Sequence, residues 1–294
     1  MKIARVLHRN EPTVVLVENG KAYPVHSMLG MAPERVEREF YNLPSLLVDH
    51  IPREAAGDFS TMDKLIPLPD VRSIRDFYAF ETHVREARKK RGLDMVPEWY
   101  KFPVFYFSNT SNLYPSGGTV PIPSYTREMD FELEIAVVIG RDGKNIQAKD
   151  AWHYVFGLTV ANDWSARDIQ REEMKVGLGP AKAKDFATSL GPLIVTADEI
   201  LQRKQRDGKI NLKMTASVNG STYSSANLNS IFWDIEKLIE WASLESRLRV
   251  GDVIMTGTVG TGCILESGDH PWLKSGDVII LSADLIGQLE NVVV

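Results

Sequence analysis

Residues 131–139 alternate in a pattern typical of a β-strand that is covered on both faces. Apolar side chains fill every second position from Phe131 to Ile139 and point to one face. The opposite face carries Asp130, Glu132, Glu134, Ala136 and Val138. A half-exposed strand would stay polar on its second face, whereas this one turns apolar, so we expect both faces to be covered there. The carboxylates of this face, Glu134 above all, therefore lie close to a predicted core and call for a function.

Short β-rich runs recur along the chain, whereas helical patterns are few. Asn19-Gly20 separates two such runs and predicts a hairpin. Residues 32–51 predict one or two helices. Further helices are expected near residues 80–91, 165–174 and 231–244. The other predicted strands begin near residues 104, 131, 155, 191, 213, 253 and 278. Because strands and helices do not alternate regularly, the pattern indicates an α+β or β-rich fold.

A Pro-containing stretch divides the chain into two parts. Residues 64–71, KLIPLPDV, carry two prolines and few helix formers, which predicts an extended connector. We place a domain boundary there. The prediction is a small β-rich N-terminal domain over residues 1–68 and a larger domain over residues 69–294, and the chain is long enough for both.

The composition restricts the class of protein. The 294 residues include 44% hydrophobic and 25% charged residues, as in globular proteins. A net charge of -5 gives no basic field, so neither nucleic acid nor a membrane is an expected partner. Cys263 is the single cysteine, and no two of the six histidines have a zinc-binding i, i+4 spacing. Without a signal-peptide pattern or a long apolar run, a cytoplasmic protein is expected.

Glu132 and Glu134 stand two residues apart on one predicted strand face, which places their Cα atoms about 6.6–6.8 Å apart. Two carboxylates at this separation can converge on a hard cation such as Mg²⁺, which takes oxygen ligands and leaves positions for water and substrate. The alternative is a solvated face near the start of the strand. The E-x-E pattern alone favours that simpler interpretation.

Asp163 ends the apolar run 155–163 and precedes a predicted helix with Ser165 near its N-cap. If that helix begins early, Asp163, Arg167 and Gln170 share one face. The carboxylate is then either a metal ligand at the end of a buried strand or one half of an ordinary i, i+4 ion pair with Arg167. This stretch alone does not separate the two interpretations.

His83 and Glu86 lie three residues apart on the helix expected near residues 80–91. A carboxylate bonded to one ring nitrogen fixes the tautomer and makes the other nitrogen more basic, so the pair could take a proton from water. The simpler alternative is an exposed helix on which the two side chains are only neighbours. The basic segment 85–91 is either the solvated face of that helix or a mobile lid that attracts acidic substrates.

Taken together, several stretches resemble the fumarylacetoacetate hydrolase (fumarylacetoacetase) family. They are DFYAFETH (76–83), PVFY (103–106), DFELE (130–134), NDWSARDIQ (162–170), LGPAKAKDFATS (178–189), GTVG (257–260) and LE (265–266). They cover roughly residues 70–294 in the family's order, and NDWSARDIQ followed by the Gly-Pro-Lys stretch is the most specific. The resemblance implies the family's mixed β-roll fold, a homodimer, and Mg²⁺ at the centre, with Ca²⁺ or Mn²⁺ as alternatives.

The resemblance also implies roles for individual residues. Those that match the metal carboxylates are Glu132, Glu134, Asp163 and, as in fumarylacetoacetase itself, Asp76. Those that match groups holding substrate oxygens are Arg167, Gln170 and Lys184. Those that match other substrate contacts are Tyr78, Tyr106 and Thr258. His83 matches the general base. Its partner would be Glu266 as in fumarylacetoacetase or Glu86 as in the acylpyruvate hydrolase branch, and the sequence retains both.

These residues predict the hydrolysis of a C–C bond in a 1,3-dicarbonyl acid. Such a substrate can chelate the metal, which stabilises the enolate that leaves, while His83 activates water. The same residues could serve a decarboxylase of oxaloacetate-like acids or an isomerase of hydroxy-dienoic diacids, and the water-activating base favours hydrolysis. A non-catalytic metal- or ligand-binding protein is the alternative from another class. Met174 stands where fumarylacetoacetase has a tyrosine, which leaves the identity of the keto acid open.

Overall fold

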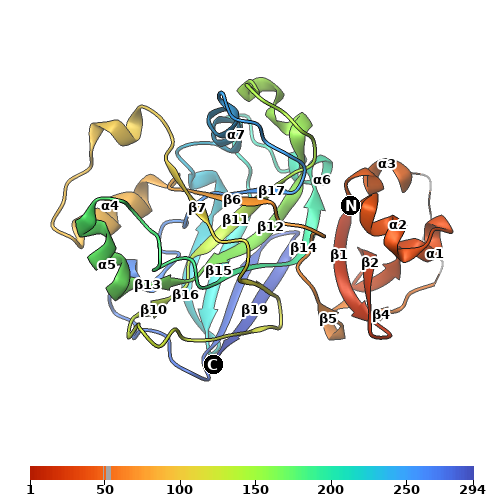
Figure 1. Ribbon diagram of the computed structural model, residues 1–294, viewed down its shortest axis with the longest axis horizontal. Helices are drawn as coiled ribbons and strands as arrows, with labels where there is room; N and C mark the ends of the chain where they lie inside the picture. Colours follow the sequence, from red (N-terminus) through yellow and green to blue (C-terminus); the bar gives the residue numbers. More distant parts are fainter. Residues whose placement is uncertain (49, 51–53) are drawn as a thin grey trace.

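Most strands belong to one large mixed sheet in the computed structural model, which describes residues 1–48, 50 and 54–294 (Figure 1). The main path of this sheet is β4-β3-β2-β1-β14-β12-β11-β17-β6-β7, with β5 beside β1 and β8 beside β14. Its strands are β1 (Lys2–His8), β2 (Glu11–Glu18), β3 (Lys21–Pro24), β4 (Gly57–Asp58), β5 (Asp63–Lys64), β6 (Ser73–Phe77), β7 (Phe105–Ser108), β8 (Leu113–Pro115), β11 (Leu133–Ile139), β12 (Val155–Asp163), β14 (Thr188–Thr196) and β17 (Asp252–Met255).

A second sheet of five strands has the order β16-β15-β18-β19-β9. Its strands are β9 (Thr119–Val120), β15 (Lys213–Val218), β16 (Ser221–Asn227), β18 (Val278–Ala283) and β19 (Gly287–Val293). A separate pair joins β10 (Met129–Asp130) to β13 (Ser165–Ala166). The strand β16 was not predicted, because its sequence STYSSAN is polar and lacks the apolar alternation that marks the other long strands.

The helices are short and lie around the two sheets. The α-helices are α1 (Val25–Leu29), α2 (Pro33–Arg38), α3 (Leu43–Leu46), α4 (Glu81–Lys89), α5 (Arg167–Val176), α6 (Ala197–Leu201), α7 (Ile235–Ser243) and α8 (Ile264–Ser267). The 3₁₀ helices are η1 (Phe40–Asn42), η2 (Phe59–Thr61), η3 (Pro97–Tyr100), η4 (Ala148–Tyr154) and η5 (Leu228–Ser230). Mixed sheets with peripheral helices confirm the predicted α+β fold class. Within the described ranges, none of these helices has the length and apolarity needed to cross a bilayer.

The strand β11 is buried along its whole length, as its alternation predicted. Leu133, Ile135 and the other odd-numbered residues pack into one hydrophobic core, whereas Ala136 and Val138 pack into a second core on the opposite face of the sheet. Glu134 belongs to that second face and is fully buried. The acid is therefore not on a solvated face, which removes the simpler interpretation of the E-x-E pattern.

The N-terminal strands join the large sheet through β1, which pairs antiparallel with β14. The hairpin predicted at Asn19-Gly20 is present between β2 and β3, and both turn residues have positive φ. The helical stretch predicted over residues 32–51 contains α2, η1 and α3, although residues 49 and 51 lie outside the described part. Figure 1 places β1 to β4 with these helices at one side of the molecule. The division into two domains at residue 68 stays a prediction.

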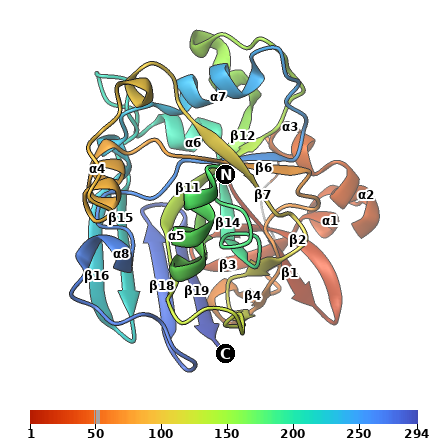
Figure 2. The same ribbon diagram turned by 60° about the vertical axis from the view of Figure 1, so that its left-hand side comes forward.

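The helix predicted after Asp163 is present as α5, which begins at Arg167. Its N-cap is Ala166, the residue after Ser165, and Ser165 itself lies in β13. The backbone of Ser165 pairs with Asp130 of β10, and its hydroxyl donates to the carbonyl of Asp163. The N-cap residue Ala166 has no side chain that could accept a hydrogen bond from the first turn of α5. Both views place α5 beside α4 at the end away from the N-terminal strands (Figures 1 and 2).

Candidate active site

A cavity of about 610 Å³ lies between the helices α4 and α5 and the ends of the central strands. The predicted site residues on its wall are Asp76, Tyr78, His83, Tyr106, Glu132, Arg167, Gln170, Lys184 and Thr258. Glu134, Asp163 and Glu266 lie behind this wall, and each is hydrogen-bonded to a residue that lines it. Glu86 does not line the cavity. The structure thus brings nearly all of the predicted site residues together.

Four acids meet in this region because their strands are neighbours in the large sheet. Glu134 lies in β11, and Asp163 ends the adjacent strand β12. On its other side β11 pairs with β17, and β17 pairs in parallel with β6, which carries Asp76. Four carboxylate oxygens lie within 4.8 Å of one another; they belong to Asp76, Glu132, Glu134 and Asp163. We call these four residues the carboxylate group.

The carboxylate group fits a divalent cation. Three of its buried oxygens, Asp76 Oδ1, Glu134 Oε1 and Asp163 Oδ1, accept no hydrogen bond from the described residues. Buried carboxylate oxygens without donors are costly unless a cation binds them. An all-oxygen set of this kind suits a hard cation such as Mg²⁺, Mn²⁺ or Ca²⁺, which also keeps positions for water and substrate.

Burial and mutual repulsion determine how the carboxylate group ionises. Burial, and then the charge of Asp163, raises the pKa of Asp76 well above its usual range. The pKa of Glu134 is also well above its usual range, through burial and then its acidic neighbours. Burial alone would raise the pKa of Glu132, but the charges of Lys184 and Arg167 hold this pKa below its usual range. Lys184 Nζ bonds Glu132 Oε2 at 2.7 Å and Asp163 Oδ2 at 2.5 Å. Lys184 and Arg167 pair with Glu132 and Asp163 but with neither Asp76 nor Glu134, and a divalent cation would supply the missing positive charge.

Arg167 is the second buried cation, and it holds three side chains in place. Its Nε donates to Asp130 Oδ2 at 2.8 Å, its Nη2 to Glu132 Oε1 at 2.7 Å, and its Nη1 to Gln170 Oε1 at 2.9 Å. Asp130 was not among the predicted site residues, although it shares the alternating face with Glu132. It accepts two further hydrogen bonds from backbone N–H groups at the start of α8. Asp130 therefore ties the cavity wall to the helix that carries Glu266.

The three residues predicted as other substrate contacts have different surroundings. The Tyr106 hydroxyl donates to Asp163 Oδ2 at 2.6 Å and to Asp76 Oδ2 at 3.1 Å, so it bridges two members of the carboxylate group. The Tyr78 ring meets the His83 ring edge-on at 5.3 Å, and burial raises the pKa of Tyr78 to about 12. Thr258 lines the cavity, and its buried hydroxyl has no hydrogen-bond partner among the described residues.

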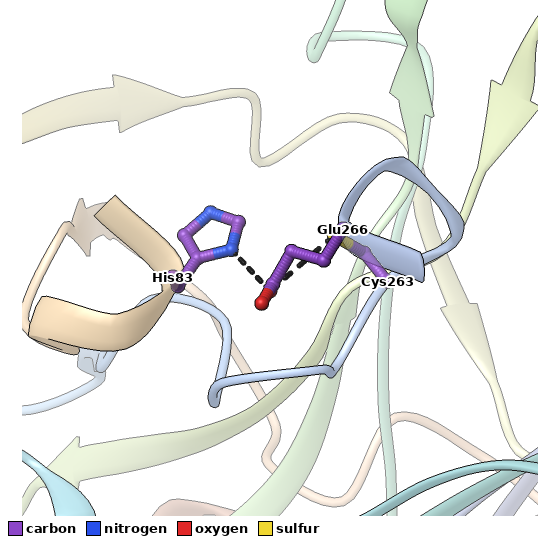
Figure 3. A group of neighbouring side chains, drawn as sticks. All are labelled: His83, Cys263 and Glu266. Carbon is purple, nitrogen blue, oxygen red and sulfur yellow. Dashed lines mark hydrogen bonds and ion pairs between the residues drawn. The ribbon is translucent and has the colours of Figure 1, made fainter. Parts of the chain in front are cut away.

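His83 pairs with Glu266 and not with Glu86 (Figure 3). His83 Nδ1 lies 2.6 Å from Glu266 Oε1, and both side chains are buried. Glu266 Oε2 accepts the backbone N–H of Thr261 at 2.7 Å, which fixes the carboxylate. No hydrogen bond joins Glu86 to His83 within the described residues, and Glu86 is half-buried on α4. Of the two candidate partners, Glu266, which is distant in the sequence, is therefore the one that contacts His83.

This pairing predicts different effects for two matched substitutions. Glu266→Gln should lower turnover by about 100-fold or more, because an amide cannot stabilise a protonated imidazole as a carboxylate does. Glu86→Gln makes the same chemical change on α4 and should alter turnover by less than about twofold, as substitutions away from the reacting atoms usually do. Steady-state kinetics of the two variants, side by side, checks this. Equal losses, or a larger loss in Glu86→Gln, would contradict the role given to Glu266.

The cavity is also lined by Arg91, Met174 and His270, which were not among the predicted site residues. Arg91, after the end of α4, reaches Met174 of α5, with Nη1 3.0 Å from the sulfur atom. His270 stacks on Tyr223 with ring centroids 3.7 Å apart. The signals in the sequence for this part of the site were the basic segment 85–91 and Met174, which stands where fumarylacetoacetase has a tyrosine. Residues 85–89 of that segment are helical, and its mobility stays a prediction.

The raised pKa of Glu134 predicts an unusual pH dependence of stability. In the unfolded chain this carboxyl ionises near its ordinary value of 4.5, whereas in the metal-free folded protein it resists ionisation. The metal-free protein therefore loses stability as the pH rises above 4.5 toward the raised pKa. Glu134→Gln cannot ionise and keeps an oxygen for the N–H of Gly257, so at neutral pH it should be more stable than the metal-free wild type, by about 1–3 kcal/mol.

Urea unfolding of both proteins in EDTA between pH 5 and 8 measures this difference. The gap should widen with pH, and Mg²⁺ should reverse it by stabilising only the wild type, since a ligand of the folded state adds stability. Parallel profiles of unfolding free energy against pH for the two proteins would show that the pKa of Glu134 is not raised in the folded protein.

A carboxylate group suited to a divalent cation and a buried histidine–glutamate pair, together in one cavity, are features of metal-dependent enzymes. The family model described as fumarylacetoacetate (FAA) hydrolase C-terminal matches residues 72–294. The chain therefore belongs to the fumarylacetoacetate hydrolase family, as its sequence motifs predicted.

Two groups of curated relatives carry different names. The mitochondrial oxaloacetate tautomerase of Xenopus laevis is 36% identical over 195 residues, which cover 66% of this chain and 59% of that protein. The fumarylacetoacetase of Arabidopsis thaliana is 27% identical over 305 residues, which cover 83% of this chain and 72% of that protein. The chain thus spans less than two thirds of the length of the tautomerase.

Solved structures share the fold along most or all of the chain. The fumarylacetoacetate hydrolase of Exiguobacterium antarcticum superposes with a TM-score of 0.73 at 23% identity, covering 100% of this chain and 99% of that one. A fumarylpyruvate hydrolase of Pseudomonas aeruginosa, in complex with Mn²⁺ and pyruvate, has a TM-score of 0.63 at 24% identity, covering 79% of this chain and 92% of that one. These likenesses confirm the family's mixed fold.

Proposed function

We propose that this protein hydrolyses a C–C bond in a 1,3-dicarbonyl acid of the acylpyruvate or fumarylacetoacetate type, with a divalent cation as cofactor. The observation that carries the proposal is the His83–Glu266 pair at the wall of the same cavity as the carboxylate group. Hydrolysis needs a base that activates water and a group that stabilises the carbanion. The His83–Glu266 pair would supply the base, and a cation held by the carboxylate group would stabilise the carbanion. We propose Mg²⁺ as the cation, which suits an all-oxygen donor set.

The base would act through the ring nitrogen that faces away from Glu266. With Nδ1–H donated to Glu266, His83 Nε2 can take a proton from water as the oxygen attacks the distal carbonyl of the substrate. The C–C bond then breaks, its electron pair goes to the carbon of the keto acid fragment, and the proton on His83 is transferred to that carbon. The other product is a carboxylic acid, so water is consumed and no further reactant is needed.

The carboxylate group would hold the cation, which when bound supplies Lewis-acid stabilisation of the enolate fragment. Lys184 has three N–H protons, and two are used on Glu132 and Asp163, so one remains for a substrate oxygen. Arg167 has five N–H protons and uses three, so two remain for a carboxylate. These unused donors support a role in orienting a keto acid in the cavity.

Interconversion of the keto and enol forms of oxaloacetate is a second candidate, favoured by the 36% identity to proteins named oxaloacetate tautomerase. The same base could move a proton between carbon and oxygen without water attack. Decarboxylation and isomerisation, which were also considered from the sequence, would use the same stabilised enolate.

Product analysis separates the two candidates. Purified protein is treated with EDTA, supplied with Mg²⁺ or left without it, and incubated with acetylpyruvate or oxaloacetate. The proposal predicts acetate and pyruvate from acetylpyruvate, only with Mg²⁺. Rapid keto–enol exchange of oxaloacetate without cleavage of acetylpyruvate would establish the tautomerase instead. The homodimer and the cytoplasmic location stay predictions from the sequence.

A further inference from the structure

A second cluster of possible metal ligands surrounds the base. Figure 3 shows the Glu266 carboxylate between the His83 ring and the Cys263 thiol. Cys263 Sγ lies 3.7 Å from Glu266 Oε1, the same oxygen that lies 2.6 Å from His83 Nδ1. One ligand atom from each of the three residues lies within 4.8 Å of the other two. The cluster therefore offers one nitrogen, one sulfur and one oxygen ligand.

This ligand set differs in kind from the carboxylate group. A thiolate and an imidazole select borderline or soft cations such as Zn²⁺ and Co²⁺, whereas Mg²⁺ prefers oxygen ligands. In a tetrahedral zinc site with bonds of about 2.0–2.3 Å, neighbouring ligand atoms lie about 3.3–3.6 Å apart. The S···O distance of 3.7 Å is close to this range, and the N···O distance of 2.6 Å must widen. His83 lines the cavity, which leaves room for water as the fourth ligand.

We propose that His83, Cys263 and Glu266 form a second metal site that takes a thiophilic divalent cation, Zn²⁺ or Co²⁺, separately from the cation of the carboxylate group. A cation bound there replaces the hydrogen bond that orients His83 and occupies the base. Zn²⁺ therefore inhibits the enzyme, and additional Mg²⁺ does not relieve the inhibition. The binding is independent of the proposed function, and only the inhibition rests on it.

Cobalt absorption tests the binding directly. Cys263 is the single cysteine of the chain, so any thiolate-to-Co²⁺ charge-transfer band must come from this residue. With Mg²⁺ saturating the carboxylate group, the wild type should develop the band at one Co²⁺ per chain. Cys263→Ser and Cys263→Ala should not. No band in the wild type would overturn the proposal, even if neither variant folds. A band that persists with the same affinity in His83→Ala would also overturn it, because the imidazole would then not be a ligand.

Zinc inhibition of the same proteins tests the consequence. At saturating Mg²⁺, the Zn²⁺ concentration for half inhibition should be at least about tenfold higher in Cys263→Ser, since loss of a thiolate ligand removes much of the affinity for zinc. Zn²⁺ also competes for oxygen ligands, so equal inhibition of both proteins, relieved by Mg²⁺, would place the inhibitory ion in the carboxylate group and contradict the proposal. If no substrate is turned over, the proposed function fails, and the cobalt band still decides the metal site.

Discussion

His83→Ala is expected to lower kcat for acylpyruvate cleavage by about 1000-fold, within the range that positioned general bases contribute, and to leave Mn²⁺ affinity within about twofold. The physical reason is that His83 bonds Glu266 and does not belong to the carboxylate group. The variant loses the acceptor for the proton of water but keeps every proposed oxygen ligand. Steady-state kinetics and Mn²⁺ titration of the same preparation measure both quantities.

The exposed His153 on η4 provides the matched control. His153→Ala should leave both kcat and Mn²⁺ affinity unchanged, which excludes a general effect of removing an imidazole. If His83→Ala retains turnover, another group activates water. If the variant loses Mn²⁺ binding together with turnover, His83 acts at the cation and the assigned role is wrong.

Asp163→Asn is expected to weaken Mn²⁺ binding by at least about 100-fold, more than the loss of a residue that only supports a ligand, and to lower turnover in parallel. Asp163 is fully buried at the end of β12, where one oxygen has no donor and the other accepts from Tyr106 and Lys184. An amide nitrogen would place a donor where the cation needs an acceptor. Isothermal titration calorimetry with Mn²⁺ measures the affinity of each protein.

The partly exposed Asp185 is the matched control, because it forms a surface ion pair with Lys182 and lies outside the carboxylate group. Asp185→Asn should bind Mn²⁺ like the wild type, since exposed ion pairs contribute little. Raising Mn²⁺ to saturation should restore part of the turnover of Asp163→Asn. Normal affinity in Asp163→Asn would remove this residue from the cation site.

The sequence predicted the parts of the site that depend on local patterns. Alternation along residues 131–139 placed Glu134 beside a core, and the apolar run before Asp163 placed that acid at a strand end. Both inferences need only the period of a strand. Asp76 has no such local signal, because it reaches the group through the parallel pairing of β6 with β17, strands that lie far apart in the sequence. Only the family motif pointed to it.

The partner of the base shows the same limit. Helical spacing offered Glu86, three residues from His83, whereas the observed partner Glu266 is 183 residues away. Cys263 was noted only as a lone cysteine, since nothing local indicates that the loop before α8 folds against α4. The pairing of β10 with β13 was not predicted either, because it joins Asp130 to Ser165, which lie 35 residues apart. Contacts between segments that lie far apart in the chain could not be predicted from local patterns in a single sequence.

A crystal structure with Mn²⁺ and oxalate would test the central claim, that the carboxylate group holds the cation that orients the keto acid. An anomalous difference map at the manganese absorption edge locates the ion without reference to the assignment of side chains. We expect one peak per chain, about 2.0–2.6 Å from oxygens of Glu132, Glu134 and Asp163, with oxalate bound to the same ion. A peak elsewhere, or oxalate bound in the cavity without Mn²⁺, would contradict the account.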